Sequence, residues 1–186
     1  MKFALLRSVA LALALSATSF GVAYAANPDV GGAPMSESKN IIENAVNSKD
    51  HTTLVAAVKA AGLVDTLSGK GPFTVFAPTN EAFAKLPKGT VDTLLKPENK
   101  AKLAKILECH VVKTDAMSST IEKMIKDDKG THEVKTLGGC VLDAKMKNGK
   151  ITLTDEKGDV ATVTIADVKQ SNGVIHVIDT VMLPKA

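Results

Sequence analysis

The chain divides near Gly130 into a first part whose apolar residues recur at helical spacing and a second part in which apolar and polar residues alternate. In the first part, Leu54, Val55 and Val58 share one side of a helix that Gly62 ends, because glycine readily adopts a left-handed conformation. A short strand over 73–77 interrupts this pattern. Thr79 is expected to cap a short helix after Pro78, and Ser119 with Glu122 forms a capping box for a helix that ends near Gly130. The other expected helical segments are 40–47, one through 54–58, 63–67, 90–95 and 97–108.

The second part predicts a run of strands joined by turns that contain glycine. Asn148-Gly149 is a strong signal for a type I′ hairpin, since both positions of that turn need a positive φ. The last strand is apolar on both faces, which is typical of a strand in the middle of a sheet. Because helices come first and strands later, the fold class is α+β. The expected strands are 133–137, 140–146, 150–154, 160–168 and 174–183.

The amino-terminal segment has the features of an export signal. Lys2 and Arg7 flank the start of a short apolar run, and the later triplet Ala23-Tyr24-Ala25 has small residues at its first and third places, as a signal-peptidase site requires. We expect a signal peptide over 1–25, cleaved between Ala25 and Ala26. The apolar run is shorter than the ~20 residues of a transmembrane helix, and no second run of that length follows. The expected location is therefore the periplasm or the medium, without a membrane span.

The remaining chain is predicted to form a short leader and one domain. Residues 26–37 are rich in glycine, proline and serine and show no period, so we expect a flexible leader. The segment 38–184 is long enough to bury a core of its own as a single domain.

The charge and the aromatic content argue against a nucleic-acid partner. The formal net charge is +3, and Lys2 and Arg7 leave with the signal peptide. All other basic residues are lysines, whereas phosphate recognition favours the forked guanidinium of arginine. Apart from histidines, the aromatic residues left after cleavage are Phe73, Phe76 and Phe83, which offer little surface for stacking on bases.

The search for reactive residues gives no convincing catalytic set. The chain contains no G-x-S-x-G, no H-E-x-x-H and no glycine-rich phosphate loop. Its histidines lack the tight spacing of metal ligands, so we expect neither a metal nor another cofactor. His176 lies in the most apolar strand and is either a core histidine bonded to backbone groups or a general base; the lack of a nucleophile favours the first. Asp179 is expected to support a turn or a backbone amide near the end of the sheet.

Cys109 and Cys140 are the two cysteines of the chain. An even number of cysteines in an exported chain favours a disulfide, because the destination is oxidising. The alternative is a pair of separately buried thiols. Cys109 lies where a predicted helix ends, and Cys140 follows the flexible Gly138-Gly139, which allows the two residues to approach each other.

Three segments resemble the signatures of the fasciclin domain. FTVFAPTNEAF, from Phe73 to Phe83, is similar to the first signature of that family. His110 and the two valines after it resemble the middle signature, and GVIHVID, from Gly173 to Asp179, resembles the last. The order and spacing also fit, and the likeness covers about 38–184. The residues assigned to this motif set are Phe76, Pro78, Thr79, Asn80, Phe83, His110, His176 and Asp179.

The resemblance implies a β-sandwich wedge with helices packed along it, in which most motif residues hold the fold together and His110 is also a candidate for an interaction role. Cys109 stands where the family usually has Tyr, and a bridge to Cys140 would replace the packing of that ring. The roles known for the family are cell adhesion, matrix attachment and surface interaction. The leading interpretation is therefore an exported, non-enzymatic module that binds a protein or a cell-surface or matrix component.

Two other functions stay open at this point. An apolar cleft between helices and sheet would make the protein a periplasmic carrier of a small apolar ligand. An enzyme is the third class, and the lack of a catalytic set counts against it. An enclosed apolar pocket would favour the carrier, whereas a flat, exposed apolar patch would favour the adhesion module.

Signal cleavage predicts that the purified secreted protein is nearly transparent at 280 nm. The chain has no Trp, and its single Tyr, Tyr24, lies in the segment that is removed. Absorbance and intact mass of secreted material check this, with the uncleaved chain as the control that keeps one Tyr. Tyr absorption from intact secreted protein would show that cleavage after Ala25 is wrong.

Overall fold

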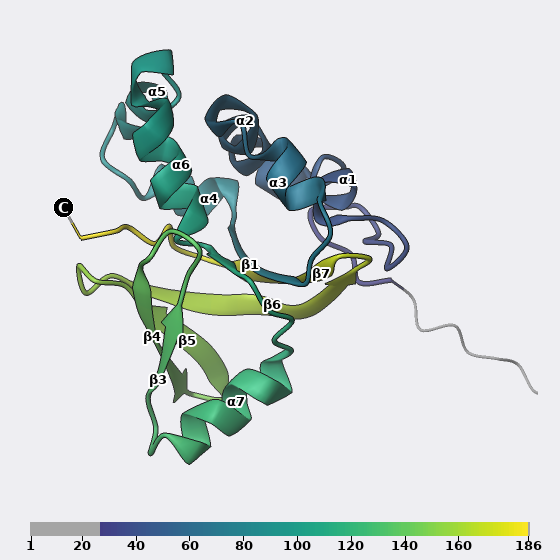
Figure 1. The fold of residues 1–186 in the computed structure, drawn as a ribbon, viewed down its shortest axis with the longest axis vertical. Helices are drawn as coiled ribbons and strands as arrows, with labels where there is room; N and C mark the ends of the chain where they lie inside the picture. Colours follow the sequence, from purple (N-terminus) through teal and green to yellow (C-terminus); the bar gives the residue numbers. More distant parts are fainter. Residues whose placement is uncertain (1–26, 186) are drawn as a thin grey trace, which may run out of the picture.

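A computed structural model describes residues 27–185 of the chain. The expected signal peptide, 1–25, and its cleavage site at Ala25 and Ala26 lie outside the described residues. The described part combines helices with one seven-stranded sheet of order β2-β1-β7-β6-β5-β4-β3, which confirms the α+β class (Figure 1). The strands are β1 Phe73–Pro78, β2 Val111–Val112, β3 His132–Lys135, β4 Val141–Lys147, β5 Lys150–Thr154, β6 Val160–Gln170 and β7 Gly173–Ile178.

The helices fall into two groups on either side of the sheet. The first six α-helices lie together above β1 and β7, and the seventh lies at the far end, where it packs on β3 and β4 (Figure 1). The α-helices are α1 Ile41–Ala45, α2 Thr52–Ala61, α3 Val64–Ser68, α4 Asn80–Ala84, α5 Thr90–Leu94, α6 Lys100–Glu108 and α7 Ser118–Asp127, and two 3₁₀ turns are η1 Lys49–His51 and η2 Pro97–Asn99.

The sheet bends at β6, its longest strand. Along β6 the register shifts between Val163 and Ile165 and again between Ile165 and Val168, and Asp167 has a φ of 60°. Such bulges bend a strand and increase its twist. One half of the sheet, β2-β1-β7-β6, therefore folds over the other half, β6-β5-β4-β3, and the two halves are the layers of the expected sandwich.

The strands β1 and β7 form the centre of the molecule and pair in parallel, from Phe73 opposite Gly173 to Pro78 opposite Ile178. The prediction that the last strand is central is confirmed, although it ends at Ile178 rather than at Leu183. On one face of this pair Val75 and Val177 pack beneath the helices, and on the other Phe76 and Ile178 face the sandwich interior. Two cores thus share one pair of strands.

The segment 26–37, which the composition predicts to be a flexible leader, packs into the helical core over its described residues. Val30 and Met35 are 4% and 2% exposed and belong to that core. Gly31 makes the close approach possible: its φ is +64°, and a Cβ there would lie 2.4 Å from Ser48 Oγ. The end of the signal peptide stays a prediction, but the leader contributes to the core.

The predicted capping box at the start of α7 is wrong. The helix begins at Ser118 with Met117 as its N-cap, two residues before the predicted N-cap Ser119, and no side chain caps it. Instead, the Ser118 backbone N–H and hydroxyl both donate to the Asp167 carboxylate, at 2.7 and 2.5 Å. The β6 bulge therefore anchors the amino terminus of α7, which sequence spacing within the helix does not indicate.

Burial of the leader predicts that Met35→Ala destabilises the domain by about 2–5 kcal/mol, as for other large-to-small substitutions in a core. Met124→Ala is the matched control, because Met124 is 37% exposed. Urea unfolding of both variants, followed by circular dichroism, measures the difference. Equal loss of stability in the two variants would contradict the packed leader.

Candidate functional site

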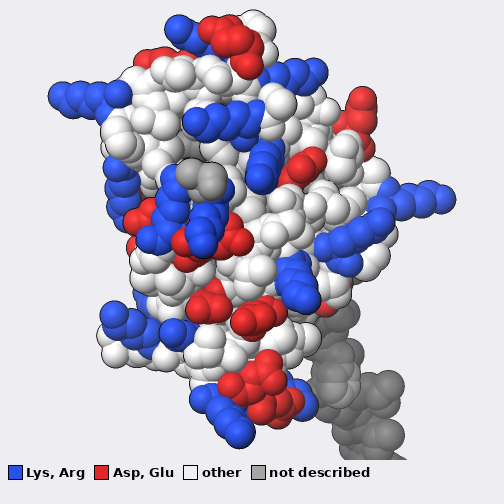
Figure 2. Space-filling view, turned by 60° about the vertical axis from the view of Figure 1, so that its left-hand side comes forward, with Lys and Arg blue, Asp and Glu red and all other residues white. Residues whose placement is uncertain are grey.

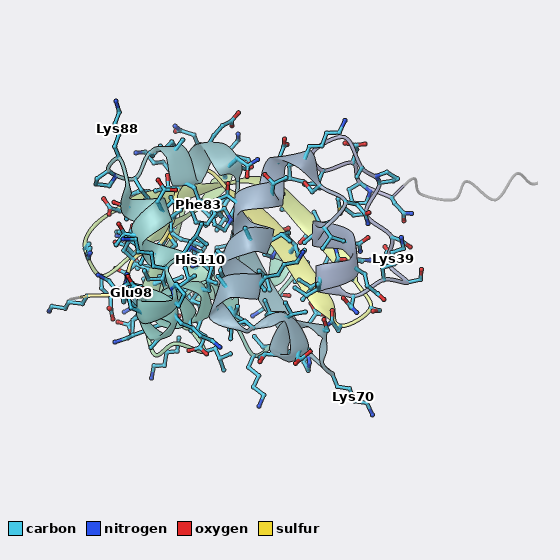
Figure 3. The ribbon with its side chains drawn as sticks, turned by 90° about the horizontal axis from the view of Figure 1, so that it is seen from above. Lys39, Lys70, Phe83, Lys88, Glu98 and His110 are labelled. Carbon is cyan, nitrogen blue, oxygen red and sulfur yellow. A yellow bond between two sulfur atoms is a disulfide. The ribbon has the colours of Figure 1, made fainter. Side chains whose placement is uncertain are left out.

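The first motif segment forms the corner between β1 and α4. Pro78 ends the strand, and Thr79 Oγ1 caps the helix by accepting from the Ala82 N–H at 3.2 Å. Asn80 reaches across to the start of α2: its Oδ1 accepts from the Thr53 N–H at 2.9 Å, and its Nδ2 donates to the Lys49 carbonyl at 2.8 Å. Phe83 is buried in the helical core (Figure 3). These contacts place the segment inside the fold.

His110 is buried between α6 and the carboxyl-terminal segment (Figure 3). Its Nδ1 donates to the Ile106 carbonyl at 2.8 Å, and its Nε2 accepts from the Met182 N–H at 2.9 Å. Burial lowers the pKa of His110 to about 4, against the smaller opposing effects of the Ile106 carbonyl and of Asp155. With both ring nitrogens bonded and 2% of the residue exposed, His110 has no free group for an outside partner.

His176 joins β7 to the segment before α7. Its Nε2 donates to the Ala116 carbonyl at 2.9 Å, its Nδ1 accepts from the Asp167 N–H at 3.2 Å, and its ring stacks on Phe76 at 5.8 Å. Burial lowers the pKa of His176, and the Ala116 carbonyl opposes this. A neutral ring with both nitrogens used holds backbone in place and cannot also act as a general base.

Asp179 lies at the end of β7 and binds β6. Its Oδ1 accepts from the Thr162 N–H at 2.8 Å, and its own N–H donates to the Thr162 carbonyl at 3.2 Å. The carboxylate thus extends the ladder between the two strands by one side-chain bond beyond Ile178.

Cys109 and Cys140 are joined by a disulfide, with their Cα atoms 5.3 Å apart. The bond ties the carboxyl terminus of α6 to the start of β4, and both residues are buried. Gly138 permits this approach, because a Cβ at that position would lie 3.0 Å from the backbone of α6. Separate buried thiols, the alternative left by the sequence, are not what the structure contains.

An apolar cavity lies between the leader, the first three helices and the strands β1 and β7. Its volume is about 50 Å³, which is room for roughly three to five water-sized spheres. The leader contributes Val30 and Met35 to its wall. Other apolar side chains in the wall are Ile41, Val55, Val58 and Val75.

His51 in η1 lines this cavity, and sequence reasoning did not single it out. It is 3% exposed, and its Nδ1 is 2.9 Å from Ser48 Oγ. Its Nε2 is buried without a hydrogen-bond partner among residues 27–185. Its neighbours Ser48, Lys49 and Asp50 are polar, so no local pattern indicates that this histidine is turned inward.

The surface carries charges of both signs. Figure 2 shows lysine and acidic side chains interspersed on the face in view, without a broad field of one sign. Over residues 27–185, no three His, Cys, Asp or Glu side chains gather as a metal site would require. In the same part of the chain, no helix has the length and apolar character needed to cross a bilayer.

The buried neutral His110 predicts that stability falls on acidification. Between pH 6.5 and about pH 4 the unfolded chain binds a proton at this residue that the folded chain does not bind, so the free energy of unfolding decreases as the pH falls. The expected loss from this residue is on the order of 3 kcal/mol. Urea unfolding at pH 7 and pH 4 measures it.

The variant His110→Gln provides the comparison, because its amide does not titrate. We expect it to be less stable than the natural protein at neutral pH but to lose less stability on acidification. If His110→Gln loses as much stability as the natural protein, the protonation of His110 is not the cause.

Comparison with known proteins identifies the family to which this chain belongs. The fasciclin-domain profile matches residues 49–184. Protein sll1483 of Synechocystis sp. is 50% identical over 155 residues, covering 83% of this chain and 79% of that protein. The cell surface glycolipoprotein MPB83 of Mycobacterium bovis is 35% identical over 170 residues, covering 88% of this chain and 70% of that protein.

A solved structure supports the same fold. The fasciclin domain pair of the insect cell adhesion molecule Fasciclin I superimposes with a TM-score of 0.54 at 24% identity, over 70% of this chain and 43% of that one. The resemblance in three sequence segments, the profile match and the sandwich with its helical layer agree. The chain belongs to the fasciclin-domain family.

Proposed function

We propose that this protein is an exported, non-enzymatic binding module that attaches to a protein or to a matrix component at the cell surface. The observation that carries the proposal is membership of a family whose relatives include a protein named as a cell surface glycolipoprotein and a fold shared with a cell adhesion molecule. The signal peptide predicted over 1–25 supports a location in the periplasm or outside the cell.

The state of the buried histidines supports a binding role rather than catalysis. Both ring nitrogens of His110 and of His176 are hydrogen-bonded to backbone groups, and neither histidine has a nucleophile as a partner. A general base needs a free nitrogen within reach of the proton it removes. The motif residues thus stabilise the fold, and the residues that recognise a partner lie on the outer surface.

The outer surface carries separate exposed apolar side chains together with charged residues. Exposed large apolar side chains come from four places in the fold: the end of α1, α7, the turn between β3 and β4, and β6. Because these side chains come from separate places, and lysine and acidic side chains are interspersed on the face in Figure 2, the surface fits a polar, protein-like partner better than a membrane. These side chains are Val46, Met124, Leu137, Val160 and Ile165.

Binding of the mature protein to its native cell envelope tests the proposal. Residues 26–186 carrying one fluorescent label are added to cells of the source bacterium that lack the gene, and unlabelled protein competes. We expect saturable, competed binding that protease treatment of the cells removes. An exported protein of similar size and charge is the control. Binding that does not saturate, or that equals the control, would overturn the proposal.

The apolar cavity favours carriage of a small apolar ligand as the second function. Its wall is almost wholly apolar, as ligand pockets are, but at about 50 Å³ it is smaller than the ~150 Å³ cavity that holds benzene. A carrier role in this conformation is therefore restricted to very small molecules or to the end of a longer chain.

A further inference from the structure

We propose that the free edge of strand β3 is a self-association surface, at which two copies of this chain pair antiparallel about a twofold axis at Val134. The inference goes beyond the proposed function, because the partner is a second copy and no cell-surface component takes part. It rests on three features of the described residues: the free backbone groups of β3, the position of α7, and the exposed charges along the edge.

The strand β3 is an edge strand of the sheet, with β4 on one side and no strand on the other (Figure 1). In an antiparallel ladder, the N–H and C=O of one residue point to the same neighbour, and those of the next residue point away from it. The Thr136 N–H donates to the Cys140 carbonyl at 2.9 Å, so Val134 also directs its backbone groups to β4. Glu133 and Lys135 therefore direct theirs to the free edge.

The chain after β3 confirms this direction. The Leu137 N–H, two residues beyond Lys135, donates to the Val111 carbonyl of β2 at 2.7 Å, across the gap between the two edges of the sheet. Among residues 27–185, no bond of this kind reaches the backbone of Glu133 or Lys135 from β2 or from the segment that follows it. Unpaired groups of this kind on an edge are a template for a further strand.

Helix α7 covers the inner face of β3 rather than its edge. Ile121 and Ile125 of α7 are buried in the sandwich interior, and Val134 packs against the same core. The helix contacts both β3 and β4 on this side. Glu133 and Lys135 alternate with Val134, so their side chains lie on the outer face, where both are exposed. A second strand can therefore approach in the plane of the sheet with its charged face in water.

A twofold axis at Val134 uses all of the free backbone groups of Glu133 and Lys135. Glu133 then lies opposite Lys135 of the second copy, and Lys135 lies opposite Glu133 of the second copy. Because the residues of each such pair exchange both of their N–H···O bonds, none of these groups stays unpaired. Val134 lies opposite its counterpart on the inner face, next to the sandwich interior.

The charges select this register over its neighbours. Opposite charges directly across two strands stabilise a sheet, whereas like charges destabilise it. A shift of the pairing by two residues would place Glu133 opposite Glu133, or Lys135 opposite Lys135. Within residues 27–185 neither side chain forms an ion pair, and Glu133 lies opposite the like-charged Asp143 of β4. Lys135 of the second copy supplies the positive charge that Glu133 lacks in the single chain.

Sedimentation equilibrium of the mature protein, residues 26–186, measures self-association. We expect a reversible dimer with a dissociation constant between about 10 μM and 1 mM, because a short edge gives a small, transient interface. Amide exchange with solvent, followed by NMR on protein labelled with nitrogen-15, locates the contact. The Glu133 and Lys135 amides should exchange more slowly as the protein concentration rises through this range.

Charge reversal tests the register. Glu133→Lys and Lys135→Glu each place like charges opposite one another at both pairs, so each variant alone should dimerise at least about tenfold more weakly. An equal mixture of the two variants restores opposite charges, and its mixed dimer should form within about threefold of the natural affinity. Lys102→Glu, on the exposed side of α6, is the matched control and should dimerise as the natural protein does.

A proline tests the backbone bonds. The Glu133 N–H points away from β4, so Glu133→Pro removes a donor of the edge without removing a bond of the β3–β4 ladder. Glu133→Thr removes the same charge but keeps the N–H, and it is the comparison. We expect the proline variant to dimerise at least about threefold more weakly than the threonine variant. Circular dichroism confirms that both variants are folded.

Three outcomes would overturn the proposal. The first is a protein that stays monomeric up to about 1 mM, well above the concentrations at which transient dimers form. The second is a dimer that both charge reversals leave unchanged, or whose Glu133 and Lys135 amides exchange freely, because its contact then lies elsewhere. The third is a monomer in which an added extended peptide slows these two amides, since the edge would then bind a strand of another protein. Because no cell envelope is present, these results leave the envelope-binding result untouched.

Discussion

The parallel pairing of β1 with β7 is the interaction on which the rest of the structure depends. It brings together segments that lie 100 residues apart in the chain, with Phe73 opposite Gly173, and a Cβ at Gly173 would lie 2.0 Å from the Phe73 carbonyl oxygen. Both strands are buried on both faces, so the pair supports the helical core on one side and the sandwich interior on the other. A change of register by one residue would exchange the two faces and disrupt both cores.

Amide side chains connect the helical layer to this pair. Asn172, in the turn before β7, accepts from the Ile41 N–H at 3.0 Å and donates to the Leu67 and Gly69 carbonyls at 2.8 and 2.9 Å. It thereby satisfies backbone groups at the start of α1 and at the end of α3 that have no partner within their helices. Asn44 binds the Ser36 backbone and Gln170, which ties the leader to β6 as well.

The same organisation bears on function. The segments that resemble the family signatures are the ones that build this centre, and their side chains are used inside it, as His110 and His176 illustrate. The family likeness therefore describes a scaffold, and a scaffold alone does not specify a partner. Under the proposed function, binding comes from what the scaffold leaves over: an outer surface of mixed charge and a small apolar cavity.

Features that depend on a few adjacent residues could be predicted from the sequence alone. The Thr79 cap, the end of α2 at Gly62 and the hairpin at Asn148-Gly149 are as predicted, because each follows from local φ preferences or from one nearby side-chain bond. The central place of the last strand was also readable, since its apolar residues fall on both faces.

Contacts between distant segments set the packing of the leader, the bulges of β6, the start of α7 and the burial of His51. The leader is short, polar on average and aperiodic. Its Val30 and Met35 are nevertheless buried against apolar side chains of α1, α2 and β7. Ser118 bonds to Asp167 in another element instead of capping locally. In each case the deciding contact joins segments far apart in the chain, and local patterns carry no information about a partner that only folding brings near.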